Sequence, residues 1–409
     1  MHVDPITCLR PAPEHAAEFA ALPYDVVSRA EAAAFVAEHP RSFLAIDRPE
    51  SAFPPDHDMY APDVYAKAAE LLEARATDGT LVADDVPCYY VWRMTGAGHT
   101  QTGVVCGASV DEYDDGTIRR HENTRAAKRA DRINHIRATG AQTGPIFLAY
   151  RALPALDACI EAATQGEPLY AFTDVTGCEH VVWRLADEDT VTTLRELFSQ
   201  VPCAYIADGH HRAASAVEVC HERREAHAAV GAPGPWDSFL AVLFPAEQLM
   251  ILPYDRVVAD TAGLDEEGLL DAISAQGFEV RDASGPVEPA EAGTFGLCTA
   301  SAWHELRLTA PADASDPVAR LDVSIAQERI LGPLLGIDDP SGNDRISFVG
   351  GEDAARRAGE AAGEKGVALS LHATSLDELM AVSDAGLLMP PKSTWFEPKL
   401  LSGLFIRRI

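Results

Sequence analysis

The stretch that decides the fold is residues 204–212, which read AYIADGHHR. Its first four residues are apolar and β-prone, and the alanine-rich segment after Arg212 predicts a helix that continues to about Arg224. A strand, a polar turn and a helix therefore follow one another directly. Because a helix N-terminus presents unpaired N–H groups and the positive end of its dipole, an anion such as phosphate is the expected ligand of this turn.

The turn carries side chains suited to a phosphorylated ligand. Asp208 offers a carboxylate for Mg²⁺, Gly209 lets backbone approach a ligand closely, and Arg212 suits bidentate contact with phosphate. His210 and His211 add two imidazoles. In the structural alternative, Asp208 caps the helix and Arg212 forms a surface ion pair, but two adjacent histidines then have no obvious role. Zinc is not favoured, since adjacent imidazoles seldom reach one ion and no H-E-x-x-H motif or cysteine partner accompanies them.

A second polar cluster, residues 121–125, reads HENTR and opens a cationic segment. Between Arg119 and Arg137 the sequence has seven basic residues and two acidic ones, which an anionic ligand would explain. Glu122 could accept a proton from a substrate hydroxyl. Asn123 and Thr124 could cap a basic helix behind them. In the alternative, the helix is exposed and laced with ion pairs, and Glu122 pairs with an arginine.

A third cluster near the C-terminus, residues 389–399, reads MPPKSTWFEPK. The Lys-Ser-Thr run lacks the glycines that precede it in a Walker A loop, so we reject a P-loop. Lys392 remains a candidate phosphate contact. The alternative is a proline-fixed segment that packs its Trp and Phe into a core. Residues 142–144, which read QTG, are a weaker polar group beside a predicted strand at 146–150.

Composition limits the possible functions. The formal net charge of −30, from 63 acidic and 33 basic residues among 409, makes general nucleic-acid binding improbable. No apolar run approaches the roughly 20 residues of a membrane span, and no secretory signal opens the chain, so we expect a cytoplasmic protein without a membrane role. The eight cysteines include no C-x-x-C pair, which argues against a zinc ribbon, an iron–sulfur site or a disulfide framework.

The length predicts two or three domains. We expect an N-terminal α+β lobe over 1–110, a core over 111–258 that carries the predicted turn, and a C-terminal α/β lobe over 259–409 that returns a site segment at 389–399. Local patterns predict a helix over 63–76 capped by Asp63. They also predict a β-hairpin over 87–110 with a five-residue loop, a strand at 250–252 that continues the sheet, and alternating strands and helices over 346–388. Ser375 and Glu378 have the spacing of a capping box.

On residues 205–212, together with 121–124, 142–147 and 389–399, the sequence resembles the prokaryotic domain-of-unknown-function family 1015 over nearly its whole length. The D-G-H-H-R turn also resembles that of the ParB/sulfiredoxin-like nucleotide-binding superfamily, and within it the archaeal free-serine kinases. This second resemblance covers chiefly 121–212. It implies an α+β fold with a ParB/sulfiredoxin-like mixed-sheet core and appended α/β lobes.

The same resemblance implies the roles of the site residues. Glu122 falls at the catalytic base, Asp208 near the Mg²⁺ ion, and His211 among the catalytic groups. The resemblance also places His210, His211 and Arg212 on the nucleotide phosphates. We further expect nucleotide or phosphate contacts from Gly209, Arg125, Lys392, Ser393 and Thr394. The expected substrate contacts are His121, Asn123, Thr124, Gln142 and Thr143. About 85 residues separate Glu122 from the turn, which implies an inserted segment. ParB-type clamps need a basic helix-turn-helix and sulfiredoxin needs a cysteine in its turn, and this sequence shows neither feature.

We therefore expect a phosphotransferase that depends on Mg²⁺ and on ATP or ADP. The acceptor implied by the resemblance is L-serine, with O-phosphoserine as the product or, in reverse, the donor. The alternatives are a phosphoserine phosphatase and a non-catalytic nucleotide-binding regulatory protein. The expected partners are a nucleotide and a small hydroxylated metabolite, and the sequence leaves the oligomeric state open.

Overall fold

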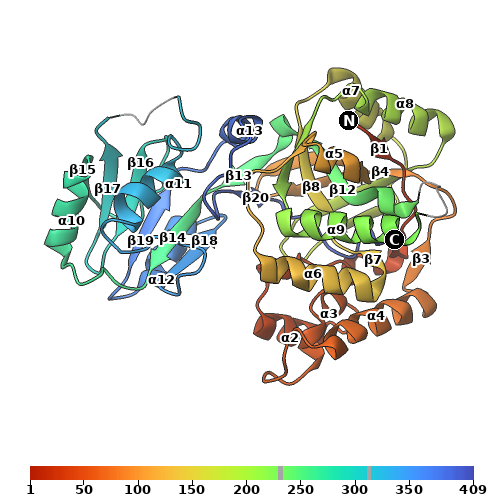
Figure 1. The fold of residues 1–409 in the computed structure, drawn as a ribbon, viewed down its shortest axis with the longest axis horizontal. Coiled ribbons are helices and arrows are strands. Elements are labelled where there is room, and N and C mark those ends of the chain that lie inside the picture. The colour runs from red at the N-terminus through yellow and green to blue at the C-terminus, as the bar shows by residue number, and fades with distance from the viewer. Residues whose placement is uncertain (229–233, 311–314) are drawn as a thin grey trace. The chain divides into compact units, whose positions relative to one another are not determined.

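The computed structural model describes residues 1–228, 234–310 and 315–409, which form two compact units (Figure 1). Unit 1 comprises Met1–Arg120, Thr124–Leu249 and Pro398–Ile409, and unit 2 comprises His121–Asn123 and Met250–Glu397. The expected boundary near residue 110 falls inside unit 1. The expected boundary near residue 258 falls inside unit 2.

A nine-stranded mixed sheet organises unit 1, in the order β6-β11-β8-β12-β5-β4-β10-β9, with β1 paired to β5. The strands are β1 Val3–Asp4, β4 Tyr89–Gly96, β5 His99–Ser109, β6 Ile118–Arg119, β8 Ile146–Tyr150, β9 Tyr170–Thr173, β10 Glu179–Leu185, β11 Ala204–Asp208 and β12 Ser238–Pro245. β6 runs parallel to β11 and β8 runs parallel to β12, whereas β8 and β11 are antiparallel. This mixed sheet with surrounding helices confirms the predicted α+β class and mixed-sheet core.

Hydrophobic runs fill the middle of this sheet. Every residue of β8 and β12 is buried, because these strands have neighbours on both edges and cover on both faces. Ile146 and Leu148 belong to the main core cluster of the unit, which also takes Ile133 and Ala213 from two helices. The sequence-predicted strands at 146–150 and 204–207 are confirmed.

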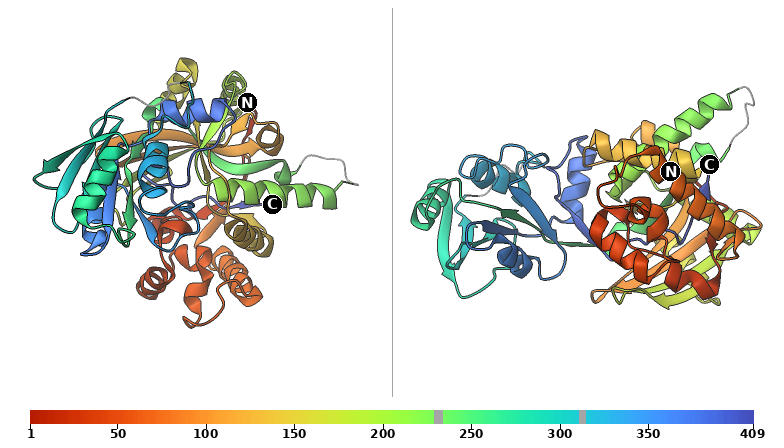
Figure 2. Two further views of the ribbon diagram at one scale, coloured as in Figure 1. Left: turned by 60° about the vertical axis from the view of Figure 1, so that its left-hand side comes forward. Right: turned by 90° about the horizontal axis from the view of Figure 1, so that it is seen from below.

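The helices of unit 1 that matter for the site are α4 Pro62–Thr77, α6 Ala126–Thr139 and α9 His210–Ala226. α6 lies beside α9, and α4 lies beside α6, as Figure 1 and the turned views of Figure 2 show. Helix α4 buries Val64, Ala68 and Leu72, which are spaced four residues apart and share one face. The remaining helices of the unit are α1 Ala16–Phe19, α2 Arg29–Glu38, α3 Leu44–Asp47, α5 Val110–Asp114, α7 Pro154–Ala163 and α8 Glu188–Phe198.

Three local predictions are wrong. The hairpin of β4 and β5 closes with two residues, Ala97 and Gly98, whose positive φ angles of 51° and 69° suit a tight turn, and not with a five-residue loop. Helix α4 begins at Pro62, so Asp63 lies in the first turn and does not cap it. Strand β13, Met250–Leu252, pairs with β20, Trp395–Glu397, and does not extend the large sheet.

Unit 2 is built on a six-stranded antiparallel sheet in the order β15-β17-β16-β19-β14-β18. The strands are β14 Tyr254–Val258, β15 Phe278–Ala283, β16 Thr294–Cys298, β17 Trp303–Leu308, β18 Ile346–Gly350 and β19 Val367–Leu371. Its helices include α10 Glu266–Ala275, α11 Asp322–Ala326, α12 Ala354–Ala362 and α13 Leu376–Asp384. Ser375 and Glu378 form the predicted capping box of α13.

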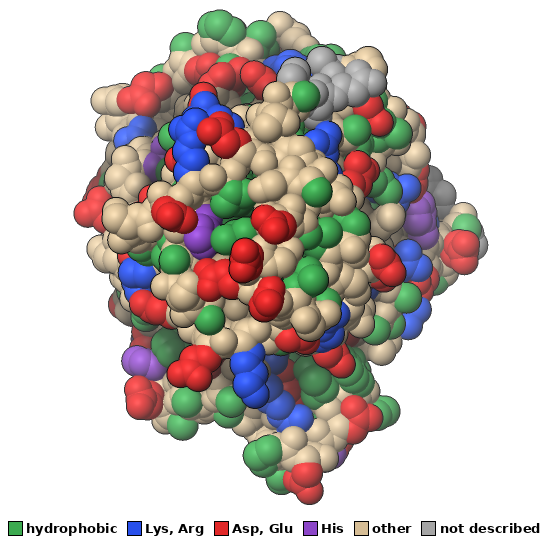
Figure 3. Space-filling view, turned by 90° about the vertical axis from the view of Figure 1, so that its left-hand side faces the viewer, with side chains coloured by type: hydrophobic (Ala, Val, Ile, Leu, Met, Phe, Trp, Pro, Cys, Tyr) green, Lys and Arg blue, Asp and Glu red, His purple; other side chains and the backbone are tan. Residues whose placement is uncertain are grey.

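The surface agrees with the acidic composition. Carboxylates are scattered over the face that Figure 3 shows. Within the described ranges, no helix combines the length and apolar character that crossing a bilayer would require.

Candidate functional site

The predicted turn joins β11 to α9 in unit 1. Gly209 is the N-cap of α9 and has φ 92°, ψ 30°, a left-handed conformation that glycine adopts without steric cost. The ladder between β11 and β8 shifts register between Ile206 and Asp208, which brings Asp208 opposite Phe147. The turn therefore places a half-buried carboxylate immediately before a 17-residue helix, whose N-terminal N–H groups favour anions.

Arg212 is fixed inside the turn. The residue is 8% exposed; Nη1 donates to the carbonyl of Pro145 at 2.7 Å and Nη2 donates to Oδ2 of Asp208 at 3.0 Å. Burial opposes the charge, but the nearby carboxylates, Asp208 first, outweigh it and raise the pKa of Arg212. A Cβ on Gly209 would lie 3.1 Å from Nε of Arg212, so the glycine also gives the guanidinium its space. The geometry makes Arg212 an anchor for the Asp208 carboxylate.

His211 connects the turn to the loop before α6. Its Nε2 accepts a hydrogen bond from the amide of Arg125 at 2.9 Å, so the neutral ring carries its proton on Nδ1. Arg125 is the N-cap residue of α6, and no side chain in the described ranges caps this helix. The expectation that Asn123 or Thr124 caps it is wrong.

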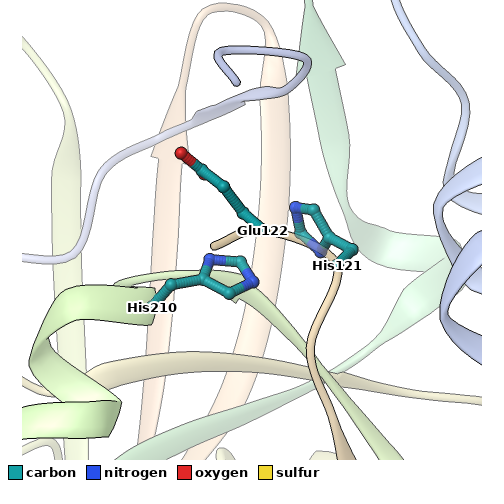
Figure 4. A group of neighbouring side chains, drawn as sticks. All are labelled: His121, Glu122 and His210. Atoms are coloured by element: carbon teal, nitrogen blue, oxygen red, sulfur yellow. The ribbon is translucent and has the colours of Figure 1, made fainter. Parts of the chain in front are cut away.

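Figure 4 shows the imidazoles of His121 and His210 and the carboxylate of Glu122. Their potential ligand atoms all lie within 4.8 Å of one another. Two imidazoles with one carboxylate suit Mn²⁺, Fe²⁺ or Zn²⁺, whereas Mg²⁺ is usually held by one or two carboxylates together with substrate phosphates. Asp208 is the carboxylate that the predicted turn offers for Mg²⁺.

A second group, Asp174, Cys178 and His180, lies in the β9–β10 hairpin and does not fit a metal. Nδ1 of His180 accepts from the indole N–H of Trp92 at 3.2 Å, so the ring proton is on Nε2, which lies 3.0 Å from Oδ2 of Asp174. A metal on Nε2 would displace this proton to Nδ1, where it would oppose the indole N–H. The buried histidine is therefore part of a hydrogen-bonded structural chain.

The three arginines of α6 form ion pairs with carboxylates. Arg129 pairs with Glu218 at 3.2 Å and Arg137 pairs with Glu222. Arg132 is buried and pairs with Asp47 at 3.0 Å and Asp131 at 2.8 Å. The alternative interpretation is therefore right about the ion pairs of α6 but not about its exposure, because the helix buries Arg132, His135 and Ile136.

A cavity of about 30 Å³, with polar and apolar side chains in its lining, lies beside Arg212 and is large enough for one or two water molecules. Its lining includes Thr143, Gly144 and Arg212, and also three residues that we did not predict, Tyr24, Asp47 and Arg132. The guanidinium of Arg132 lies 4.0 Å from the ring centroid of Tyr24. A signal for Arg132 was available, because Arg132, His135 and Ile136 recur at helical spacing and share the buried face of α6.

Gln142 is engaged in the core of unit 1. Its Oε1 accepts from the amide of Leu240 at 2.6 Å, and its Nε2 donates to Sγ of Cys220 at 3.6 Å. The carbonyl of Thr143 accepts from the amide of Gly403. These bonds give both residues a structural role between β7, Ala141–Gln142, and its neighbours.

Lys392, Ser393 and Thr394 belong to unit 2. Lys392 has a positive φ of 62°, its carbonyl accepts from Nη2 of Arg256 at 3.1 Å, and its Nζ lies 5.4 Å from the ring centroid of Tyr254. The hydroxyl of Ser393 donates to the carbonyl of Pro390 at 2.6 Å. This segment is irregular, and hydrogen bonds within unit 2 hold it in place.

Comparisons with known proteins identify the family. No curated protein matches the chain. Solved structures with weak similarity include a free serine kinase in complex with AMP, at 16% identity and TM-score 0.36, covering 72% of this chain and 86% of that one. A conserved hypothetical protein from Pyrococcus furiosus aligns at 15% identity and TM-score 0.37, covering 75% and 95%. C-terminally truncated SbnI from Staphylococcus aureus aligns at 14% identity and TM-score 0.39, covering 74% and 87%.

These TM-scores are too low to support an argument about activity. The family model, in contrast, matches residues 3–324, which is most of the chain. The chain belongs to the family described as Protein of unknown function (DUF1015).

Proposed function

We propose that this protein is a nucleotide- and Mg²⁺-dependent phosphotransferase that phosphorylates the hydroxyl of L-serine or a similar small metabolite. The observation that carries the proposal is the β11–α9 turn, where the Asp208 carboxylate is anchored by Arg212 at the N-terminus of a long helix. Such a turn favours a phosphate group beside a carboxylate that can hold a metal.

In this proposal the residues have distinct roles. Glu122 orients or deprotonates the acceptor hydroxyl, and His210 and His211 contact the phosphates. Asp208 would hold Mg²⁺, which, when bound, neutralises charge on the transferred phosphoryl group. Arg212 is a positioning residue, since its Nη1 and Nη2 donate to Pro145 and Asp208. Gly209 would bring a backbone N–H group to this end of the site, and the side chain of Arg125 would contact the phosphates, because its amide already donates to Nε2 of His211.

Phosphorus NMR tests the proposal. The protein is incubated with Mg²⁺, L-serine and either ATP or ADP, and the O-phosphoserine signal is followed. Wild type should form O-phosphoserine. Glu122→Gln and Asp208→Asn should each lose activity by roughly 100-fold or more, whereas Glu222→Gln, which changes a half-buried carboxylate of α9 paired with Arg137, should retain it.

Two results would reject the kinase. Release of inorganic phosphate from O-phosphoserine without nucleotide would identify a phosphatase. Saturable nucleotide binding without any phosphorylated product, across a panel of amino acids and hydroxy acids, would leave a binding protein. Unchanged turnover by Glu122→Gln would remove Glu122 from the mechanism even if the activity exists.

A further inference from the structure

Strands β8 and β12 of unit 1 end together, at a place remote in the sheet from the Asp208 turn. They run parallel, and Tyr150 at the end of β8 lies opposite Pro245 at the end of β12. β11 runs antiparallel to β8, with Asp208 opposite Phe147. Tyr150 is three residues further along β8, about 10 Å away at the rise of a strand. The loops after β8 and β12 therefore lie at the opposite end of β8 from the Asp208 turn.

Two oxygen atoms at this place are buried and, among the described residues, lack hydrogen-bond partners. The Tyr150 side chain is 0% exposed, and its hydroxyl makes no hydrogen bond within the described residues. Oδ1 of Asp157, in the first turn of α7, is likewise buried and without a hydrogen-bond partner in the described part of the chain. Buried polar atoms are rarely left unsatisfied in folded proteins, so such a pair indicates a ligand, an ion or an ordered water.

A third oxygen donor comes from the loop after β12. The carboxylate of Glu247, in the single 3₁₀ turn Ala246–Gln248, accepts from the amide of Ala152 at 3.2 and 3.4 Å. This bond holds Glu247 against the loop that joins Tyr150 to α7. Burial raises the pKa of Asp157, and the charge of Glu247 raises it further. Burial also raises the pKa of Tyr150, and the charges of Asp157 and then Glu247 add to the shift.

We propose that Tyr150, Asp157 and Glu247 form a binding site for a hard divalent cation such as Ca²⁺. The donors are all oxygen atoms, which suit Ca²⁺ or Mg²⁺, whereas softer metals favour nitrogen and sulfur. Ca²⁺ fits this set better than Mg²⁺, because it accepts irregular geometry and Mg²⁺ demands a near-octahedral one. A cation would occupy the unsatisfied oxygen atoms and offset two neighbouring negative charges. The site does not depend on the proposed phosphotransferase activity.

Terbium luminescence tests this site directly, since Tb³⁺ replaces Ca²⁺ and its emission is sensitised by a nearby tyrosine. Full-length wild-type protein should show saturable Tb³⁺ emission that excess Ca²⁺ reverses. Asp157→Asn and Glu247→Gln should each weaken this binding by roughly tenfold or more, because carboxylate number sets affinity in oxygen sites. Tyr150→Phe fills the same space and should lower the emission most strongly.

Matched variants separate this site from other carboxylates. Glu161→Gln changes an exposed carboxylate of the same helix, paired with Arg93, and should bind Tb³⁺ as wild type does. Asp208→Asn should also leave the Tyr150-dependent emission in place. Unaltered Tb³⁺ and Ca²⁺ affinity in Asp157→Asn would overturn the proposal. The absence of saturable Tb³⁺ binding to wild type would also overturn it, and would mean that an ordered water satisfies both oxygen atoms.

Discussion

At the scale of single residues, Gly209 decides whether the turn can form. Its φ of 92° is costly for any residue with a Cβ, and the added Cβ would also press on the Arg212 guanidinium at 3.1 Å. Arg212 in turn anchors the Asp208 carboxylate. One glycine thus controls both the backbone and the position of the carboxylate that the proposed mechanism needs.

Gly209→Ala tests this role against a matched glycine. Gly79 has φ 87°, but a Cβ added there would meet no described atom within 4 Å, so Gly79→Ala measures backbone strain alone, about 1 kcal/mol. Gly209→Ala should cost about 1 kcal/mol more, because the guanidinium must also shift. Urea denaturation of both variants gives the comparison. Equal losses of unfolding free energy in the two variants would show that crowding of the Arg212 guanidinium does not contribute to the loss.

At the scale of secondary-structure elements, the sheet of unit 2 contains a fully buried acidic residue, Asp255. It lies on β14, is 0% exposed, and its Oδ1 accepts from the amide of Leu371 on β19 at 3.1 Å. Burial raises its pKa to about 7, although the Leu371 amide and Arg256 act in the opposite direction. The folded state therefore retains a proton on Asp255 over a pH range in which the unfolded chain has lost it.

The sign of the pH effect follows from this difference. With a folded pKa above the unfolded value of 3.8, the contribution of Asp255 is fully present below pH 4 and is lost as pH rises toward 7. The side chain of Asp255→Asn does not titrate in this range, so the variant lacks this pH-dependent loss of stability. Between pH 4 and pH 8 the wild type should lose about 2–4 kcal/mol of unfolding free energy relative to this variant.

Urea unfolding at the two pH values measures the difference. Asp271→Asn, which changes an exposed carboxylate on α10 of the same unit, should track the wild type at both. If Asp255→Asn and wild type showed the same pH dependence, Asp255 would not be the group that retains the proton.

At the scale of the whole molecule, the net charge of −30 opposes the compact state through self-repulsion. Added salt shortens the screening length from about 10 Å at 0.1 M to about 3 Å at 1 M, so the repulsion should weaken. The midpoint of thermal unfolding at pH 7 should therefore rise by at least about 2 °C over this range of NaCl.

The same titration near pH 5 provides the control. The sequence pI is about 4.7, so the net charge is small near pH 5. Added NaCl should therefore raise the midpoint of thermal unfolding by less than at pH 7. An equal rise at both pH values would assign the effect to general salting-out of apolar surface, and not to charge repulsion.

The sequence alone determined the elements whose signals are local. The strand, turn and helix over 204–224 follow from an apolar run, a glycine and an alanine-rich segment, and the α13 capping box follows from the spacing of Ser375 and Glu378. The strand at 146–150 was equally predictable, because buried parallel strands are continuous apolar runs. The family resemblance stated from the motifs is confirmed by the match over residues 3–324.

Only the tertiary structure decided how the polar residues are used. The sequence marked Arg132 as one cation among seven, but its role depends on Asp47, 85 residues away, and on the ring of Tyr24. Gln142 bonds Leu240 and Cys220 across the core, and residues 398–409 return to unit 1. These contacts join distant parts of the chain, and no local propensity specifies them. Local backbone preference therefore fixed the elements, while long-range packing fixed the partners of each charged group.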